Sequence, residues 1–247
     1  MSFFNLQNNN ILITGAGSGI GQETAITLSK LGCNLVLFDI SEESLSQTLN
    51  LLDGQHKAYG IDLTKFDILP DIIKEIILSQ GPIDGFVHCA GISSRKPLNT
   101  LKPEGFAKVM NVNFFAFEEL VRLLAKRGNF NDGGSIVVMS SISSIRGYKA
   151  KAEYCVSKAA VDAFVRCMAL ELAPRRIRVN SVMPAEVLTP LAFQARKLNA
   201  GVGASDFTAP LGPTEPGEVA NTIAFLLSNC TKTITGSSIV IDGGATI

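Results

Sequence analysis

Tyr154 and Lys158 are the two residues whose types and spacing first suggest chemistry. Side chains four positions apart lie on the same face of a helix, one turn from each other. A free tyrosine has a pKa of about 10, and a nearby ammonium group favours the phenolate and lowers that pKa. The pair could therefore exchange a proton with a substrate near neutral pH. The same spacing is common on solvated helices, so other residues must decide between the two interpretations.

A serine and an asparagine upstream of this pair are the next candidates. The apolar run Ile136–Met139 is typical of a buried strand and ends in Ser140 and Ser141, and Ser141 lies 13 positions before Tyr154. Asn113 falls inside a predicted helix, where asparagine is disfavoured because its side chain competes for backbone hydrogen bonds. A functional reason for its presence there is therefore credible.

A glycine-rich turn follows the first predicted strand. The apolar run before it leads into Gly15-Ala16-Gly17-Ser18-Gly19-Ile20-Gly21, and a helical pattern begins at Ile20. Glycine permits positive φ and close backbone approach to a ligand, and a helix N-terminus offers unpaired N–H groups to a phosphate. The turn by itself could be purely structural, but it also predicts a site for the pyrophosphate of a dinucleotide.

Asp39 closes the second predicted strand, 24 residues after Gly15. An acid near this offset accepts hydrogen bonds from the ribose hydroxyls of a bound dinucleotide. A carboxylate there would repel the 2′-phosphate of NADP, so Asp39 favours NAD. The alternative is a surface aspartate that caps the next helix.

Predicted strands and helices alternate along the whole chain. The strands are expected at Asn10–Thr14, Asn34–Asp39, Lys57–Ile61, Ile83–Cys89, Ser135–Ser140, Ile177–Val182 and Ser238–Ile241. The helices are expected near Ile20–Leu31, Glu42–Leu52, Leu69–Ser79, Pro103–Arg127, Glu153–Ala173 and Pro216–Ser228. Strands that are continuous apolar runs are buried on both faces. The pattern predicts an α/β fold, a single-domain Rossmann-type, doubly wound parallel sheet of about seven strands flanked by helices, over residues 1–247.

Composition narrows the possible functions. The formal net charge is zero and no basic run occurs, which argues against a nucleic-acid partner. The first ten residues lack the blocks of a signal peptide, and no apolar run reaches the roughly 18 residues of a membrane helix, so we expect a soluble, cytoplasmic protein. The five cysteines are scattered without a CxxC spacing, which favours reduced thiols over disulfides or a zinc site.

Together these motifs resemble the short-chain dehydrogenase/reductase family. The matching segments are Thr14-Gly15-x-x-x-Gly19-x-Gly21, Asn113, Ser141, Tyr154-Cys155-Val156-Ser157-Lys158-Ala159-Ala160, Arg178-Val179-Asn180, Thr235-Gly236 and Asp242-Gly243-Gly244. The resemblance spans about Leu6 to Gly244. Two departures occur. The family usually has Asn-Asn-Ala-Gly where this chain has His88-Cys89-Ala90-Gly91, and Ala185 replaces a glycine. We expect His88 and Cys89 to pack at the strand end.

The resemblance implies a role for each catalytic candidate. Tyr154 would exchange a proton with the carbonyl or alcohol oxygen, and Ser141 would hydrogen-bond to the same oxygen. Lys158 would bind the nicotinamide ribose and lower the pKa of Tyr154, while Asn113 would hold a water that links Lys158 to solvent. Hydride would pass directly to or from the nicotinamide, so no metal is needed.

The resemblance also implies a set of cofactor contacts. Val187 and Thr189 match positions that meet the nicotinamide carboxamide, although Thr189 could be an ordinary loop residue. Asp62 matches an adenine contact, although it could instead cap a helix. Ser18 stands where relatives that use NADP often carry Arg or Lys. The predicted cofactor-binding residues are Gly15, Gly17, Ser18, Gly19, Ile20, Gly21, Asp39, Asp62, Leu63, Ala90, Gly91, Tyr154, Lys158, Pro184, Val187 and Thr189.

The sequence thus predicts an NAD(H)-dependent oxidoreductase that interconverts a secondary alcohol and a ketone, with Tyr154 as general acid and base. The alternatives are an NADPH-dependent 3-oxoacyl-thioester (acyl-carrier-protein) reductase and a non-catalytic dinucleotide-binding sensor. Residues 184–213, rich in Ala, Gly and Pro, are expected to form a substrate-binding loop. No clamp for an anionic substrate can be assigned among Arg95, Arg146 and Arg196. The resemblance implies a homotetramer.

Overall fold

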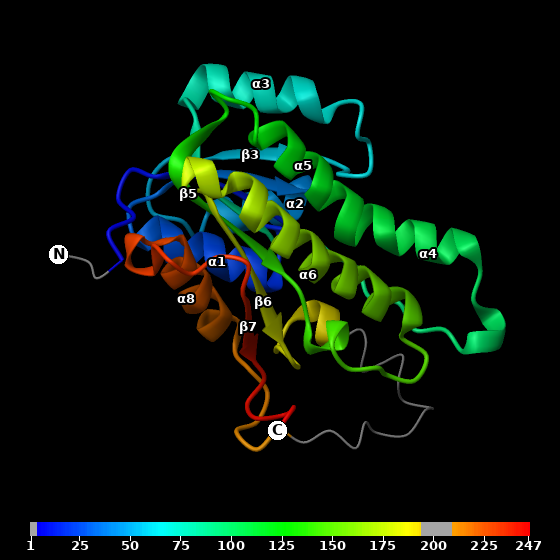
Figure 1. Cartoon of the computed structure of the whole chain (residues 1–247). Helices are drawn as coiled ribbons and strands as arrows, with labels where there is room; N and C mark the ends of the chain where they lie inside the picture. Colours follow the sequence, from blue (N-terminus) through cyan, green and yellow to red (C-terminus); the bar gives the residue numbers. More distant parts are fainter. Residues whose placement is uncertain (1–3, 194–208) are drawn as a thin grey trace.

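The computed structural model describes residues 4–193 and 209–247. Seven parallel strands form one sheet in the order β3-β2-β1-β4-β5-β6-β7 (Figure 1), which confirms the predicted fold class. The strands are β1 (Asn10–Thr14), β2 (Asn34–Asp39), β3 (Lys57–Gly60), β4 (Ile83–His88), β5 (Phe130–Met139), β6 (Arg178–Pro184) and β7 (Ser238–Ile241). The expected loop at 184–213 is described only at its ends, and Arg196 lies outside the described residues.

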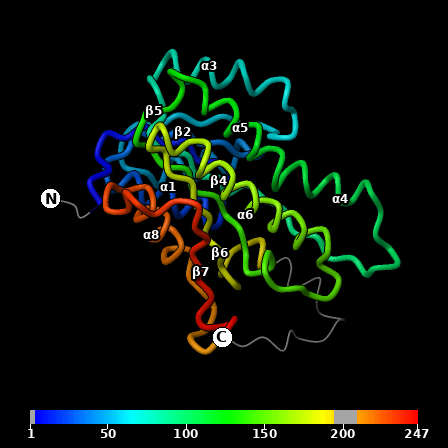
Figure 2. Tube along the Cα trace, in the orientation of Figure 1, coloured from blue at the N-terminus to red at the C-terminus, as the bar shows by residue number. Residues whose placement is uncertain are grey.

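Helices cover both faces of this sheet (Figure 2). They are α1 (Gly19–Lys30), α2 (Glu42–Leu49), α3 (Leu69–Gln80), α4 (Pro103–Met110), α5 (Ala116–Leu124), α6 (Ala152–Leu172) and α8 (Pro216–Leu227). Helices α3, α5 and α6 contribute to one apolar core, and α1, α2 and α8 contribute to the other. Within the described part of the chain, no helix is both long and apolar enough to span a membrane.

The two cores explain the unbroken apolar runs of the central strands. Along β1, Leu12 belongs to the core under α3, α5 and α6, while Ile11 and Ile13 belong to the core under α1 and α8. Successive strand side chains point to opposite faces, so a strand covered on both faces must be apolar at every position. Full burial of each such side chain contributes about 1.5–3 kcal/mol of transfer free energy.

The strand order creates a crevice between β1 and β4. The chain runs outward from β1 through β2 to β3, and it then returns to β4 on the other side of β1. In sheets of this type ligands bind outside the carboxyl ends of the strands at this switch point. The glycine turn after β1 and Ala90 and Gly91 after β4 therefore meet there.

Two elements differ from the sequence prediction. The single helix expected at Pro103–Arg127 is interrupted by a π-helical turn at Asn111–Phe115, which separates α4 from α5. Strand β5 begins at Phe130 rather than Ser135, because its first residues pair with β4 across an irregularity in register. The polar Asn131–Gly134 stretch hides this early start from an analysis of apolar runs.

Candidate active site

The glycine turn forms a backbone cradle at the N-terminus of α1. Gly15 and Gly19 adopt φ values of +67° and +56°, a left-handed conformation that favours glycine. A Cβ atom on Gly15 would lie 2.7 Å from the backbone nitrogen of Ala90, so the two strand ends can approach only because this side chain is absent. Ser18 precedes α1 and its side chain makes no capping hydrogen bond. The first N–H groups of α1 can therefore meet a phosphate.

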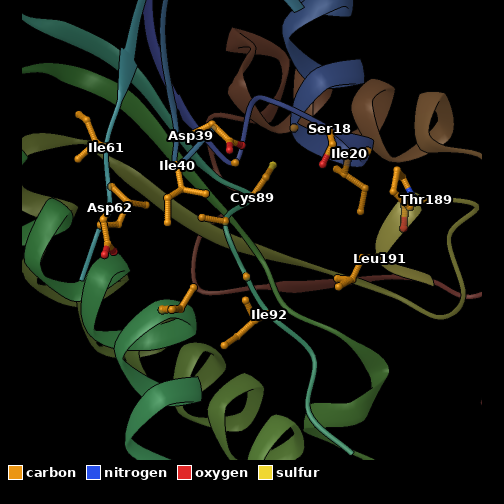
Figure 3. Close-up of a pocket in the computed structure, with 18 of the residues that line it drawn as sticks. Ser18, Ile20, Asp39, Ile40, Ile61, Asp62, Cys89, Ile92, Thr189 and Leu191 are labelled. Atoms are coloured by element: carbon orange, nitrogen blue, oxygen red, sulfur yellow. The ribbon is translucent and has the colours of Figure 1, made fainter. Parts of the chain in front are cut away.

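A cavity of about 500 Å³ opens at this cradle (Figure 3). Its size is within the range of known ligand sites. The predicted cofactor residues on its wall are Gly15, Ser18, Gly19, Ile20, Gly21, Asp39, Asp62, Leu63, Ala90, Gly91 and Thr189. In Figure 3, Ile61 and Asp62 lie at one end of the cavity, and Thr189 and Leu191 lie at the other. The cradle, the carboxylate of Asp39 and this extended shape fit a dinucleotide.

Five predicted cofactor residues are not on this wall: Tyr154 and Lys158, whose positions are described below, and Gly17, Pro184 and Val187. Gly17 is buried, and a Cβ atom there would lie 2.8 Å from Cγ of Asp39. Val187 is buried in the core shared with α1 and α8, and Pro184 is buried at the end of β6. By contrast, Thr189 lies against the cradle, since a Cβ atom on Gly19 would be 3.2 Å from its Cγ2 atom.

Asp39 directs its carboxylate toward the glycine turn. One oxygen accepts a hydrogen bond from the backbone N–H of Gly17 at 2.9 Å, and the other accepts from Ser41 N–H at 3.0 Å. The side chain that caps α2 is that of Ser41, which accepts from Ser44 N–H. The alternative that Asp39 caps this helix is therefore wrong. Each carboxylate oxygen can accept more than one hydrogen bond, so Asp39 can still bind ribose hydroxyls.

Asp62 also lies on the cavity wall and closes a turn. Its carboxylate accepts from the backbone N–H of Thr64 at 3.0 Å and from the Thr64 hydroxyl at 2.7 Å, and these bonds lower the pKa of Asp62. The next helix begins only at Leu69, so the alternative that Asp62 caps a helix is wrong as well. Asp62 remains available to a ligand at this end of the cavity.

Ser141, Tyr154 and Lys158 come together beside Gly91. The Ser141 hydroxyl is close enough to the Tyr154 phenol to lower its pKa, and the Lys158 ammonium lies 5.8 Å from the centre of the Tyr154 ring. Lys158 is buried and donates to the carbonyl of Met139 at 2.7 Å. A Cβ atom on Gly91 would lie 3.6 Å from Nζ of Lys158, so this group borders the cavity.

The neighbouring serines face elsewhere. The Ser140 hydroxyl donates to the carboxylate of Asp162 at 2.9 Å. The Ser143 backbone N–H donates to the Ser141 hydroxyl at 3.1 Å, which orients Ser141 at the start of a short 3₁₀ turn. The structure thus supports the choice of Ser141 as the serine that meets Tyr154.

Asn113 lies in the π-helical turn and is fully buried. Its side chain exchanges two hydrogen bonds with the backbone of Ile92, at 2.8 Å and 3.0 Å, and donates to the Ser157 hydroxyl at 3.0 Å. Asn113 therefore joins the loop after β4 to α6. Its partner on α6, Ser157, directly precedes Lys158. The π turn agrees with a functional role for Asn113, because such turns are frequent at functional sites. The predicted role of Asn113 in holding a water stays a prediction.

Comparisons with known proteins agree with this geometry. A family model described as Enoyl-(Acyl carrier protein) reductase matches residues 15–246. A solved short-chain type dehydrogenase/reductase from Mycobacterium ulcerans is 28% identical, with a TM-score of 0.88, and the match covers 98% of this chain and 90% of that one. The chain belongs to the short-chain dehydrogenase/reductase family.

Relatives of this short-chain dehydrogenase/reductase carry different names. A 3-oxoacyl-(acyl-carrier-protein) reductase of Thermotoga maritima is 34% identical, and the match covers 98% of this chain and 99% of the relative's chain. An NAD-dependent glycerol dehydrogenase of Listeria innocua is 32% identical, and the match covers 99% of this chain and 96% of the relative's chain. The family consists of oxidoreductases that act on CH–OH groups with a nicotinamide dinucleotide, and the chain is an oxidoreductase of this kind.

The pKa of Tyr154 in this short-chain dehydrogenase/reductase contradicts the sequence prediction. Burial raises the pKa of Tyr154 to about 12, and the hydrogen bond from Ser141 only partly offsets this effect. Burial also lowers the pKa of Lys158 to about 8. The prediction of a lowered Tyr154 pKa was wrong because it weighed the ammonium charge alone. Loss of water from around both groups is the larger effect.

The departure at the end of β4 changes packing more than chemistry. His88 is fully buried and its Nδ1 lies 2.9 Å from the Thr14 hydroxyl, which links β4 to β1. Its ring packs against those of Phe86 and Phe117, and burial lowers the pKa of His88 to about 3. The prediction that His88 packs at the strand end is confirmed. Cys89 instead lines the cavity, and burial raises the pKa of its thiol to about 12.

Two buried carboxylates near the site escaped the sequence analysis. Asp162 on α6 accepts from the hydroxyls of Ser140 at 2.9 Å and Ser181 at 2.7 Å. Glu153, directly before Tyr154, is bound by the Ser94 hydroxyl and lies 3.4 Å from Nζ of Lys96. Asp162 stands four positions after Lys158, so helical spacing could have identified it. Glu153 carried no such signal, because its partners follow β4.

Proposed function

We propose that this chain is an NAD(H)-dependent oxidoreductase that transfers a hydride between nicotinamide and a secondary alcohol or ketone, with Tyr154 as general acid and base. The convergence of Ser141, Tyr154 and the buried Lys158 next to the cavity wall at Gly91 carries this proposal. It supports a single point at which a substrate oxygen meets a proton donor and a second hydrogen-bond donor.

Each of the three side chains has a separate role in the reaction at that substrate oxygen. The raised pKa keeps the Tyr154 phenol protonated at neutral pH, as a proton donor to a carbonyl oxygen must be. Ser141 donates a hydrogen bond to the same oxygen while negative charge develops on it. The Lys158 ammonium, still largely charged at pH 7, stabilises the phenolate that remains. In alcohol oxidation the same groups act in reverse. When bound, the nicotinamide supplies or accepts the hydride at the substrate carbon.

The preference for NAD rests on the surroundings of Asp39. Its carboxylate lies on the cavity wall, and none of the described residues on that wall is Lys or Arg. A 2′-phosphate would therefore meet a negative charge without a compensating cation. The name of the Listeria innocua relative, an NAD-dependent glycerol dehydrogenase, agrees with this preference.

A second candidate function is NADPH-dependent reduction of a 3-oxoacyl thioester. The similarity to the Thermotoga maritima 3-oxoacyl-(acyl-carrier-protein) reductase favours it, and the carboxylate of Asp39 disfavours it. A non-catalytic dinucleotide sensor would not require Ser141, Tyr154 and Lys158 to converge. The homotetramer and the cytoplasmic location stay predictions from the sequence.

Two measurements test the proposed function. Fluorescence titration should show that NADH binds more tightly than NADPH, and equal or reversed affinities would overturn the cofactor assignment. A substrate panel of acyl thioesters, polyols, sugars and steroids, assayed with NAD and NADH, should show turnover of at least one compound. Tight NADH binding without turnover across the panel would favour the sensor.

A further inference from the structure

Positive charge is concentrated in two segments of the chain that precede Tyr154. The two segments 92–97 and 142–151 hold Arg95, Lys96, Arg146, Lys149 and Lys151 and contain no Asp or Glu, in a chain whose formal net charge is zero. The first segment follows β4 and the second follows β5. Both therefore lie at the carboxyl edge of the sheet, where substrates approach in folds of this type.

A backbone hydrogen bond holds these two segments together. The N–H of Lys96 donates to the carbonyl of Ala150 at 2.7 Å. The side chain of Lys96 turns to the buried Glu153, 3.4 Å away. Arg95 is close enough to Lys151 for its charge to lower the pKa of Lys151, after the larger effect of burial. The bond thus joins the segment of Arg95 to that of Lys151, which are within electrostatic reach of each other, while Lys96 is paired with Glu153.

The ring of Tyr148 lies near two cations, Lys151 and Arg146. Nζ of Lys151 lies 5.3 Å from the centre of this ring, and Cζ of Arg146 lies 6.0 Å from it. Cations at such distances are attracted by the face of an aromatic ring. The ring therefore fixes the positions of Lys151 and Arg146 relative to each other.

Among the cations of this cluster, Lys151 is the nearest in sequence to Tyr154. It is the N-cap residue of α6, three positions before Tyr154, and it is only partly exposed. Glu186, in the loop after β6, is also within electrostatic reach of Lys151. Lys151 thus lies at the start of the helix that carries Tyr154, within electrostatic reach of Arg95 after β4 and of Glu186 after β6.

Two acidic residues of the described chain act electrostatically on this cluster, Glu186 on Lys151 and Asp242 on Tyr148. Glu186 is exposed. Asp242 faces Tyr148, but its carboxylate accepts hydrogen bonds from the backbone N–H groups of Gly244 and Thr246 and from the Thr246 hydroxyl. Among the described residues, the cluster thus holds Arg95, Arg146 and Lys151, with Glu186 within electrostatic reach of Lys151 and Asp242 engaged in its own turn.

We propose that the substrate carries an anionic group, a carboxylate or a phosphate, and that Lys151 binds this group, with Arg146 and Arg95 adding to the positive field. The inference rests on the proposed function, because it assumes that Tyr154 acts on the alcohol or ketone of the same molecule. Hydrogen bonds between an ammonium and an anionic oxygen are about twice as strong as neutral ones. A cationic cleft also raises the local concentration of an anionic substrate.

Matched substrate pairs test this inference. Acetoacetate and methyl acetoacetate differ in a carboxylate, and dihydroxyacetone phosphate and dihydroxyacetone differ in a phosphate. In the wild-type protein, kcat/KM with NADH should be at least tenfold higher for the charged member of one pair, and the pair that responds identifies the anion. Lys151→Met should reduce kcat/KM for that charged member at least tenfold more than for its neutral partner. Lys149→Met, which removes an exposed lysine from the same segment, should change neither.

Three results would overturn the inference. The first is a neutral member used as well as the charged member in both pairs, or neutral ketones used while no charged member is used. The second is an equal loss for both members in Lys151→Met, which would mark a structural role. Thermal unfolding of each variant detects a folding defect. The third is an equal effect of Lys149→Met.

A binding measurement separates this inference from the proposed function. If the wild-type protein turns over no carbonyl compound, the proposed function fails, but anion binding can still be measured. Titration calorimetry of the NADH-loaded protein with malonate and with inorganic phosphate should then give binding by one of the two that Lys151→Met weakens at least tenfold. Absence of binding, or equal binding by the variant, would contradict the inference.

Discussion

The two ends of the active-site region are built from different parts of the chain. At the dinucleotide end, the glycine turn and Asp39 follow two consecutive strands, and they contact each other through a backbone N–H group at Gly17. At the catalytic end, Ser141 follows β5, Tyr154 lies in α6 and Asn113 lies in the π turn. Hydrogen bonds hold the side chain of Ser141 to the backbone of Ser143, and that of Asn113 to Ile92 and Ser157. We therefore expect backbone shape to govern cofactor binding and side-chain burial to govern proton transfer. Substitutions should separate these two functions.

The largest expected effect is at the catalytic end. Tyr154→Phe removes the proton donor and should lower kcat by about 10³-fold, within the range for loss of a general acid. The dissociation constant for NADH should stay within about twofold, because the dinucleotide end is untouched. Steady-state kinetics and fluorescence titration measure the two quantities.

Tyr59→Phe is the matched control for this substitution. It removes a phenol that donates to Glu75 at 3.1 Å on the exposed side of β3, so kcat should not change. Wild-type turnover by Tyr154→Phe would show that proton transfer does not depend on this end of the site.

The next effect concerns His88, which lies where the two ends meet. Its folded-state pKa is about 3, so below about pH 6.5 the unfolded chain takes up a proton that the folded chain does not. The stability due to neutral His88 is therefore complete above pH 6.5 and is lost as the pH falls. It should be about 2 kcal/mol lower at pH 5 than at neutral pH.

His88→Asn should remove this part of the acid sensitivity. Urea unfolding at pH 7.5 and pH 5 should show a fall in the free energy of unfolding that is about 2 kcal/mol smaller for the variant than for the wild type. NMR of the imidazole protons should show no titration of His88 above pH 5. Equal falls for both proteins would mean that His88 is accessible to protons in the folded state.

At the dinucleotide end, Asp39→Asn should weaken NADH binding about tenfold, which corresponds to about 1.4 kcal/mol. The amide removes the charge and one acceptor oxygen. Its remaining oxygen can still accept from Gly17 N–H, while the N–H of Ser41 loses its acceptor. NADPH should bind the variant no more weakly than it binds the wild type. Fluorescence titration with both cofactors measures the change.

Asp71→Asn is the control for this charge, because Asp71 is exposed on α3. Its NADH affinity should equal that of the wild type. A loss of NADH and NADPH affinity by the same factor in Asp39→Asn would mean that the carboxylate only shapes the turn.

The smallest expected effect tests the support behind the catalytic end. Asp162→Asn leaves one acceptor oxygen where Ser140 and Ser181 each donate to a carboxylate oxygen, so one hydroxyl must lose its acceptor. Since Ser140 adjoins Ser141, kcat should fall about fivefold with the NADH dissociation constant unchanged. This figure reflects a loss of about 1 kcal/mol for one hydrogen bond. A change in NADH affinity as large as that in kcat would contradict a role confined to the catalytic end.

The sequence predicted the fold well where apolar runs are long. The strands around β1 and β4 and the glycine turn were placed within a residue or two, because burial on both faces demands apolar residues at every position. The π turn at Asn111–Phe115 was missed, since a single inserted residue leaves the helical pattern almost unchanged. The early start of β5 was missed because its first residues are polar.

Some residues of the site were predicted correctly from the sequence and others were not. Spacing identified Ser141, Tyr154 and Lys158 as a group, and the structure brings them together. Spacing could not show that Gly17 and Val187 face away from the cavity, because that depends on which side of a buried loop each residue takes. The cluster of Arg95, Arg146 and Lys151 was invisible because its members follow two different strands.

By itself the sequence determined the order of strands and helices, the glycine turn and the helical spacing of Tyr154 and Lys158, because these depend on residues close together in the chain. Only the tertiary structure decided the depth of Tyr154 and hence its raised pKa, the pairing of Ser140 with Asp162, and the meeting of Lys151 with Arg95. Those properties depend on which distant segments exclude water from one another.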